Sequence, residues 1–305
     1  MKLEDQCCHF LDDICEGLAK RSRIIYRMAL NDVIAMFGSR DPNSLTTPDI
    51  RQWIDRELVK HCPKTVRANL LVFLRYIRWL SDRGMIAPDK EEIFAPRKLQ
   101  KLNIINPPKH AILEEEHEAL LDEIRRGQCQ PWWLTSCLMG WPLGLRVSDV
   151  AMSRWTNVDL ARGIYTECPQ KTRRLGKVVT IPMDPQLRDW LTTLQERPYY
   201  QSPFIIPDMM GYYVANPSKL NHQFTKITTA AKVNPLITFH SYRHAFVSRL
   251  LDAGIEPIVI ASMTGQTVKQ IEEYAHISLE AKTRALRLAR EHAQQDRIQR
   301  NAQTA

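Results

Sequence analysis

The chain carries the run His240-Ser241-Tyr242-Arg243-His244 at the start of a segment, Ser241–Ala253, whose pattern predicts a helix. A His-x-x-Arg spacing arises by chance in many proteins, so this run has little weight alone. Four further features stand in order around it, and their joint order is far more specific than any member. They are Gly144-Leu145-Arg146-Val147-Ser148-Asp149 and Lys171 before the run, then Thr264-Gly265-Gln266 and Tyr274-Ala275-His276 after it.

The sequence around these features predicts a mixed domain that is mainly helical with a small β component. Two β-like runs, Ile164–Cys168 and Lys177–Ile181, flank the basic stretch Lys171–Gly176, a pattern typical of a hairpin with a basic tip. A last helix is expected over Ser278–Arg300, which is rich in Ala, Leu, Arg, Glu and Gln. Another predicted helix begins with Leu113–Glu116. The remaining predicted helices span Trp132–Met139, Val147–Met152, Pro185–Gln195, Pro217–Lys232, Ser241–Ala253 and Glu256–Met263.

The N-terminal part of the chain predicts an almost entirely helical domain. One helix is expected around Asn31–Phe37, and another begins with Thr47 as its N-cap and Pro48 at its first position. The next helix spans Pro63–Asp82, and Gly84 ends it. Its predicted core stripe consists of Leu70, Phe73, Leu74, Ile77 and Leu80.

The other faces of the helix over Pro63–Asp82 are basic, and two interpretations of them stay open. The first is an ordinary solvated face. The second is contact with the phosphates of DNA, which the features of the second half favour. The candidate DNA-contact residues are Lys64, Arg67, Arg75 and Arg78, with Thr65 and Asn69 as uncharged donors.

Between the two halves, residues 96–110 lack sustained periodicity and combine prolines with lysines. This composition is typical of a linker. The expected organisation is therefore a helical domain over 1–95, a basic linker over 96–110 and a second domain over 111–305. The prolines and lysines are Pro96, Lys98, Lys101, Pro107, Pro108 and Lys109.

The charge balance favours a polyanionic partner such as nucleic acid. Lys and Arg number 42 against 34 Asp and Glu, which gives a net charge of +8. No run of about 18 uncharged apolar residues is present, so no membrane span is expected. The acidic start at Glu4-Asp5 has no apolar run characteristic of a signal peptide, and a cytoplasmic protein is expected.

The seven cysteines are scattered, which favours reduced thiols over a disulfide framework. The cluster Cys7-Cys8-His9 with Cys15 suggests a metal site at first sight. No second ligand pair stands at the spacing of a zinc finger. Neither a metal nor another cofactor is therefore expected.

The ordered features resemble the tyrosine recombinases, the class that contains phage integrases, the Xer resolvases and Cre. This class shares its catalytic domain with type IB topoisomerases. The resemblance covers nearly the whole chain, including the runs Pro63–Asn69 and Trp79–Gly84 in the N-terminal half. It implies the two-domain layout of Xer and Cre, in which a helical core-binding domain precedes a mixed α/β catalytic domain.

The resemblance also implies roles for the ordered residues. Arg146 and Arg243 would bind the non-bridging phosphate oxygens, because a planar guanidinium makes bidentate contacts that lysine cannot copy. Lys171 would protonate the leaving 5′ oxygen as general acid, and His240 would assist proton transfer or hydrogen-bond the phosphate. Tyr274 would attack the phosphate, leaving a 3′-phosphotyrosine link and a free 5′ hydroxyl without using ATP or a metal.

Two of these assignments are qualified by neighbouring residues. The family places a carboxylate at the position of Asp149, where it braces the first arginine. Lys171 is preferred as general acid because a hairpin that begins Lys-Thr resembles many integrases. Its rivals nearby are Arg173, Arg174 and Lys177.

One position departs from the family pattern. Histidine or tryptophan usually follows the glycine, whereas this chain has Gln266, which can donate a hydrogen bond but cannot carry a proton or a charge. Tyr212 and Tyr213 are rival nucleophiles, but they precede the His-x-x-Arg run and fall out of order. Tyr242 and His244 are interpreted as packing or DNA-side residues.

Three functions are compatible with this pattern. The first is a site-specific recombinase or integrase acting on double-stranded DNA, with four protomers in the synapse. The C-terminal helix would dock between neighbours, as family analogy favours, or lie on its own domain. The second is a DNA-binding accessory protein on the same scaffold with weak or lost catalysis, for which Gln266 is the only argument. A type IB topoisomerase is the third. The sequence indicates neither the target site nor whether an accessory DNA-bending protein takes part.

Overall fold

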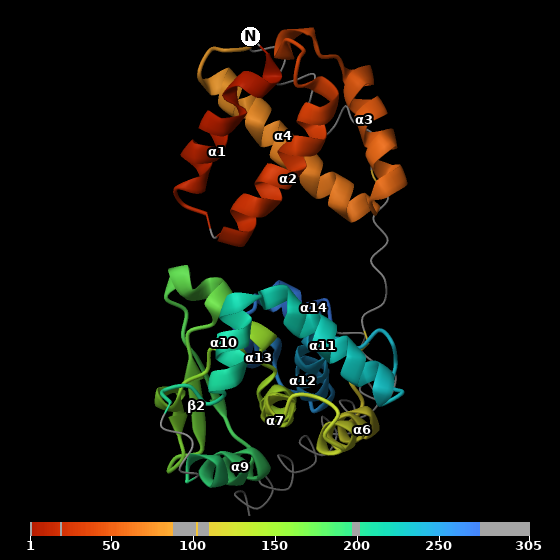
Figure 1. The fold of residues 1–305 in the computed structure, drawn as a ribbon. Helices are drawn as coiled ribbons and strands as arrows, with labels where there is room; N and C mark the ends of the chain where they lie inside the picture. Colours follow the sequence, from red (N-terminus) through yellow and green to blue (C-terminus); the bar gives the residue numbers. More distant parts are fainter. Residues whose placement is uncertain (1, 19, 88–101, 103–109, 197–201, 275–305) are drawn as a thin grey trace, which may run out of the picture. The chain divides into compact units, whose positions relative to one another are not determined.

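A computed structural model describes residues 2–18, 20–87, 102, 110–196 and 202–274 (Figure 1). The chain divides into two compact units, Met1–Pro107 and Pro108–Ala305. The predicted helix over Ser278–Arg300 and nearly all of the predicted linker lie outside the described residues. Among the helices of the described segments, none is both long enough and apolar enough to cross a membrane.

The N-terminal unit is a bundle in which α4 (Pro63–Asp82) packs against the other three long helices. These are α1 (Cys7–Cys15), α2 (Lys20–Phe37) and α3 (Thr47–Lys60). Short 3-10 helices, η1 (Leu3–Gln6) and η2 (Pro42–Ser44), complete it. Its largest fully buried side chains are Phe10, Phe37, Trp53, Phe73 and Tyr76.

Helix α4 has the bounds that the sequence predicts. Four residues of the predicted stripe are buried, and Leu74 is half-buried. The start of α3 differs from its prediction, since Thr46 rather than Thr47 is the N-cap. The Thr46 side chain accepts from the N–H of Asp49, whose carboxylate accepts from the N–H of Thr46 in return. This reciprocal pair is a capping box, which only the earlier threonine can form with Asp49.

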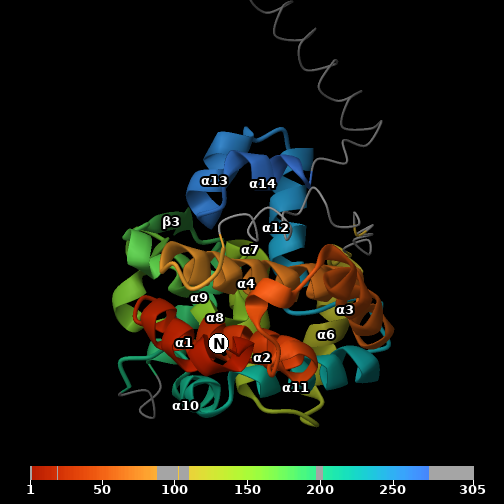
Figure 2. The ribbon, with the colours of Figure 1, turned by 90° about the horizontal axis from the view of Figure 1, so that it is seen from above.

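The C-terminal unit has a largely helical core that holds a cluster of aromatic rings. Trp133, Phe224, Phe239 and Tyr242 are fully buried, with neighbouring ring centroids 5.2–6.2 Å apart. Figure 2 shows α13 and α14 next to each other beyond α12. The helices are α6 (Glu114–Arg125), α7 (Trp132–Leu143), α8 (Val147–Ala151), α9 (Pro185–Gln195), α10 (Pro207–Ala215), α11 (Pro217–Ala230), α12 (His240–Asp252), α13 (Pro257–Thr264) and α14 (Val268–Glu272).

A three-stranded antiparallel sheet in the order β1-β2-β3 stands beside these helices. Strands β2 (Ile164–Glu167) and β3 (Val179–Pro182) form the predicted hairpin, and β1 (Val158–Asp159) pairs with β2. The hairpin tip is not a plain turn but the 3-10 helix η5 (Gln170–Leu175). The expected fold class, mainly α with a small β component, is confirmed.

Candidate active site

The turn between α7 and α8 positions Arg146. Helix α7 ends at Gly144, whose φ of +58° favours glycine. A Cβ there would also lie 2.6 Å from the ring of Phe246, so no larger residue fits without movement. Two residues later, Arg146 is the extended N-cap of α8, and its Nη1 lies 3.4 Å from Oδ2 of Asp149.

Asp149 connects this turn to the hairpin. Its side chain is buried, and while Oδ2 faces Arg146, Oδ1 accepts a hydrogen bond of 2.9 Å from the backbone N–H of Gln170. Gln170 is the first residue of η5 and directly precedes Lys171. One carboxylate therefore holds both the first arginine and the base of the segment that carries the predicted general acid.

Arg243 is buried on α12 and is fixed by all three of its nitrogens. Nη1 donates to the carbonyl of Gly144 at 3.2 Å, Nη2 donates to the carbonyl of Thr264, and Nε donates to Oε1 of Gln266 at 3.0 Å. Burial, followed by the charge of Arg146, lowers the pKa of Arg243 to about 10. The guanidinium is still cationic at neutral pH, so two positive charges share the site.

Gln266 lies between Arg243 and Tyr274. It follows Gly265, which ends α13 with a φ of +66°, and its side chain is buried. With Oε1 held by Arg243, its Nε2 donates to the hydroxyl of Tyr274 at 3.3 Å. The residue that departs from the family pattern is thus the one that links the second arginine to the predicted nucleophile.

Tyr274 follows α14 and lies half-buried against His244 of α12. Its ring centroid is 4.7 Å from that of His244, which in turn is 4.8 Å from the ring of His240. His244 is buried, whereas His240 is exposed at the first position of the helix. Tyr274 also packs on the small cluster formed by Val247, Ile260, Ala261 and Ile271.

Lys171 is exposed in η5, and the side chains of Arg173 and Lys177 are exposed as well. Burial therefore does not distinguish Lys171 from these two rivals. The side chain of the third rival, Arg174, lies outside the described structure. The distinguishing observation is that Lys171 directly follows Gln170, the residue that Asp149 anchors.

The rival tyrosines are elsewhere in the unit. Tyr212 and Tyr213 lie on α10 and pack against the main core, with the ring of Tyr212 5.6 Å from that of Trp132. Tyr242 is fully buried, and its hydroxyl lies 3.2 Å from Nδ1 of His117. Of the tyrosines discussed, Tyr274 is the one that meets the Arg243–Gln266 pair.

Sequence reasoning missed a buried carboxyl beside the site, that of Glu167 at the end of β2. Its Oε2 accepts a hydrogen bond of 2.5 Å from the hydroxyl of Tyr165. Burial, and next the charge of Asp149, raise its pKa to about 7, against the opposing charges of Arg146 and Arg243. A signal was available, because strand alternation puts Tyr165 and Glu167 on the same face.

Arg146 and Arg243 lie near one another, and Arg243 is joined through Gln266 to the hydroxyl of Tyr274. Two guanidiniums can bind an anionic group such as a phosphodiester through charge-assisted hydrogen bonds. The hydroxyl of Tyr274 lies at hydrogen-bond distance from the amide of Gln266, which Arg243 holds in turn. The site therefore offers two guanidiniums to an anionic group and places a tyrosine hydroxyl beside one of them through Gln266.

The candidate DNA-contact residues lie on α4, in the other unit. Lys64, Thr65, Arg67 and Arg78 are exposed and Asn69 is half-buried. Arg75 is also exposed but is engaged locally, since its Nη1 donates to the hydroxyl of Tyr26 at 2.7 Å. The four basic residues share the exposed side of one helix.

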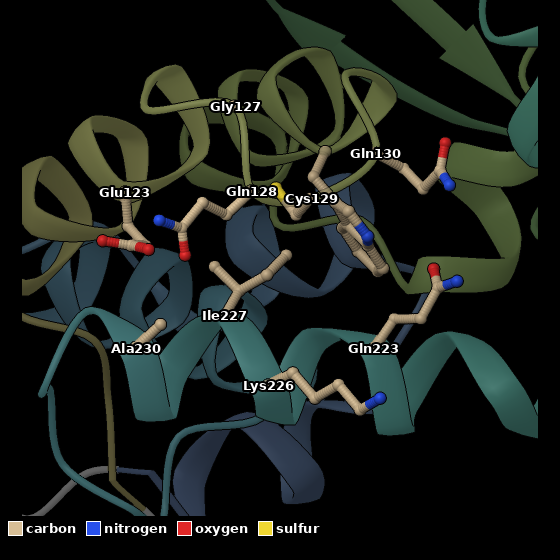
Figure 3. A pocket seen from close by; sticks show the side chains of 10 residues that line it. Glu123, Gly127, Gln128, Cys129, Gln130, Gln223, Lys226, Ile227 and Ala230 are labelled. Atoms are coloured by element: carbon tan, nitrogen blue, oxygen red, sulfur yellow. The ribbon is translucent and has the colours of Figure 1, made fainter.

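A separate pocket of about 510 Å³ lies between the α6–α7 loop and α11 (Figure 3). Gln128, Cys129 and Trp133 line one side and Gln223, Lys226 and Ile227 the other. None of the predicted site residues is part of its lining. The pocket is therefore distinct from the candidate active site.

Comparison with known proteins gives a consistent result at the level of sequence. The profile of the phage integrase family matches residues 110–280, more than half of the chain. The tyrosine recombinase XerD of Lacticaseibacillus casei is 24% identical over 285 residues, covering 88% of this chain and 92% of that protein. A tyrosine recombinase of Agathobacter rectalis is 18% identical over 265 residues, covering 83% and 85%.

Solved structures share the fold. The Tn1549 transposon integrase in complex with a circular intermediate DNA has a TM-score of 0.73 at 17% identity, covering 94% of this chain and 99% of that one. A lambda integrase dimer bound to a COC′ core site has a TM-score of 0.72 at 12% identity, covering 90% and 95%. With the family profile matched over most of the C-terminal unit, the chain belongs to the phage integrase family, the tyrosine recombinases.

Proposed function

We propose that this protein is a site-specific recombinase that cuts and rejoins DNA through a covalent link to Tyr274. The observation that carries the proposal is the hydrogen-bonded connection from Arg243 through Gln266 to the hydroxyl of Tyr274. A free tyrosine has a pKa of about 10 and is a poor nucleophile at neutral pH, so it needs such neighbours.

In the proposed reaction, Arg146 and Arg243 bind the non-bridging oxygens of the scissile phosphate. The hydroxyl of Tyr274 gives its proton to His240, and its oxygen forms a bond to phosphorus. The bond from phosphorus to the 5′ oxygen breaks, and Lys171 gives that oxygen a proton. The phosphoester is conserved in the 3′-phosphotyrosine link, so attack by a 5′ hydroxyl reverses the step without ATP.

Asp149 acts in this scheme as a positioning residue. It lies 3.4 Å from the guanidinium of Arg146 and also holds the backbone N–H before Lys171. Asp149 thereby ties the backbone before the proposed general acid to the proposed phosphate-binding arginine. Because Lys171 is exposed on its hairpin, it is accessible to a bound DNA strand.

Double-stranded DNA is the proposed substrate, and a tetrameric synapse the proposed assembly. The net charge of +8 and the basic face of α4 support a DNA partner. Two proteins of the same fold were solved with DNA, the Tn1549 integrase with a circular intermediate and lambda integrase as a dimer on a core site. By analogy, we assign the N-terminal unit to core-site binding and the C-terminal unit to catalysis.

One observation favours an alternative, an accessory protein with weak catalysis, and that is Gln266 in place of histidine or tryptophan. The amide cannot carry a proton. Its side chain nevertheless joins Arg243 to the hydroxyl of Tyr274 through two hydrogen bonds. The active recombinase is therefore the proposal that the geometry supports better.

The test is covalent trapping on a nicked suicide substrate. Duplexes selected from a random library for tight binding supply the DNA, and denaturing gels and mass spectrometry of the linked peptide detect the adduct. We expect an adduct on Tyr274 with the unchanged protein and with Tyr213→Phe, and none with Tyr274→Phe. All three should bind the duplex equally, because affinity depends on many phosphate contacts. An adduct formed by Tyr274→Phe would contradict the proposal.

A further inference from the structure

Three potential metal ligands meet in the N-terminal unit, which holds none of the residues of the candidate active site. Asp32 on α2, Glu57 on α3 and His61, which follows α3, place one ligand atom each within 4.8 Å of the others. Glu57 and His61 are four residues apart, so they lie on the same side of the end of α3. Asp32 reaches this point from a different helix.

Glu57 is the unusual member of this cluster. Its side chain is 1% exposed, and Oε1 accepts from the ammonium of Lys60 at 3.0 Å. Oε2 is buried and has no hydrogen-bond donor among the described residues. Nε2 of His61 lies 3.8 Å from it, beyond hydrogen-bond range. A buried carboxylate oxygen without a hydrogen-bond donor is costly, so a cation held between Oε2 and the imidazole of His61 would stabilise this position.

We propose that Asp32, Glu57 and His61 bind a divalent first-row transition cation of the Zn²⁺ type. Two carboxylates with one imidazole suit such ions, whereas Mg²⁺ and Ca²⁺ prefer sets made only of oxygen. Ligands about 2.1 Å from a tetrahedral ion lie roughly 3.4 Å apart. The Glu57–His61 separation of 3.8 Å therefore closes with a shift of a few tenths of an ångström.

The surroundings fit an ion that enters from solvent. His61 is 39% exposed and Asp32 is half-buried, so the ligand side opposite Glu57 is open, and water can complete the coordination. Lys60 balances one of the two carboxylate charges and leaves the second for the ion. This set does not include Cys7, Cys8 or His9, the cluster considered in the sequence. The sequence predicted no metal site in the chain, and this proposal departs from that prediction.

The consequence of binding is a clamp between α2 and the end of α3. His61 and Cys62 form the connection to α4, so the ion also fixes the turn from which the basic face of α4 begins. An ion that binds the folded chain and not the unfolded chain raises the melting temperature. The proposal does not depend on the proposed reaction, and its readouts involve neither DNA nor strand cleavage.

The test uses the full chain, stripped with EDTA under reducing conditions and titrated with ZnCl₂ in a calorimeter and in thermal melts. We expect a saturable rise in Tm with zinc and no comparable rise with MgCl₂ or CaCl₂ at the same concentrations. Asp32→Asn and His61→Gln should each weaken zinc binding on the order of tenfold or more, as loss of even a supporting group costs 10–100-fold. Both variants should melt like the unchanged protein in EDTA.

Two control variants keep the proposal falsifiable. Asp55→Asn removes an exposed carboxylate from the same helix, and His9→Gln removes an exposed imidazole beside Cys8, so both should keep the zinc response. Glu57→Gln should lose it, while its melting in EDTA is unaffected or raised because a buried charge is gone. The proposal is overturned if zinc stabilises Asp32→Asn and His61→Gln as much as the unchanged protein. An equal rise with magnesium would overturn the assigned class of ion.

Discussion

Gln266 donates a hydrogen bond from Nε2 to the hydroxyl oxygen of Tyr274 over 3.3 Å. The orientation of this amide is fixed by chemistry, because the Nε of Arg243 can only donate and must face Oε1. Nε2 is then the atom that faces Tyr274. The phenol oxygen therefore accepts the hydrogen bond from Gln266, and its own proton points to a different group. A neutral amide thereby orients the proposed nucleophile.

The first prediction separates this donor from mere packing. Gln266→Glu keeps the size and the contact to Arg243 but replaces the donor by an anion next to the proposed phenolate and phosphate. Loss of one donor at a developing anion costs about 10²–10³ in rate, so a loss of that order is expected in single-turnover cleavage of a suicide substrate. Gln266→His restores a donor and should stay within about tenfold of the unchanged protein. Equal cleavage by Gln266→Glu would show that the amide has no part in the step.

Arg243→Lys tests whether the planar guanidinium is needed or only its positive charge. The guanidinium meets two backbone carbonyls and Gln266 in three directions, which one ammonium at a shorter reach cannot reproduce. We expect most of the cleavage activity to be lost and the free energy of unfolding to fall by roughly 1–3 kcal/mol. Arg188→Lys, on the exposed side of α9, is the matched control and should change neither quantity. Normal cleavage by Arg243→Lys would mean that the wrong arginine has been assigned.

The elements that the sequence predicts well have strong local signals. Proline starts and apolar periodicity define α4 and α9, and both have the predicted bounds. The helix α10 was not predicted, because its Met-Met-Gly-Tyr-Tyr run includes a glycine and no clear period. The five-residue α14 is too short to show a period at all. The cap of α3 was placed one residue late, although Thr46 and Asp49 have the spacing of a capping box.

The candidate site could be predicted only as a set of residues, not as a geometry. The order of motifs identifies Arg146, Arg243 and Tyr274, but the contacts that join them come from distant parts of the chain. Arg243 reaches a carbonyl 99 residues earlier at Gly144, and Asp149 reaches an N–H 21 residues later at Gln170. Such pairs have no local pattern. For the same reason, the linking position of Gln266 is visible only in the structure.

A prediction about pH follows from Glu167. Its pKa is raised from an ordinary value of 4.5 to about 7, so the folded chain binds this proton more tightly than the unfolded chain. The contribution of Glu167 to the free energy of unfolding therefore falls as pH rises from about 4.5 to about 7, and it stays low above that range. Glu167→Gln removes this dependence, while its amide oxygen can still accept from Tyr165.

The measurement is urea unfolding of both proteins at several pH values, followed by subtraction. Relative to the unchanged protein, the variant should gain stability across the window by an amount on the order of 3 kcal/mol, since one pKa unit is about 1.4 kcal/mol. The difference in slope is the test, because packing changes shift both ends equally. Glu196→Gln, an exposed carboxyl after α9, should give a flat difference. A flat difference for Glu167→Gln as well would contradict the raised pKa.

The last prediction decides between the two interpretations of the basic face of α4. Lys64 and Arg67 are exposed at the start of this helix, and replacing both by alanine removes two charges without disturbing the buried stripe. If they neutralise phosphates, the slope of log affinity against log salt should become shallower by about 1.8, at about 0.9 for each phosphate. Arg75 is left in place, because its contact with Tyr26 would mix a packing loss with the loss of charge.

The matched control is Arg125→Ala with Arg126→Ala, which removes the same net charge from the other unit. These two arginines are paired with Asp122 and Glu123, so they add little positive potential for DNA. Binding by this control should keep the slope of the unchanged protein. If Lys64→Ala with Arg67→Ala also keeps it, the face of α4 is only solvated. Mapping the nick on the suicide substrate adds a second readout, since phosphate contacts position the protein without reading bases, and the cleavage position should not move.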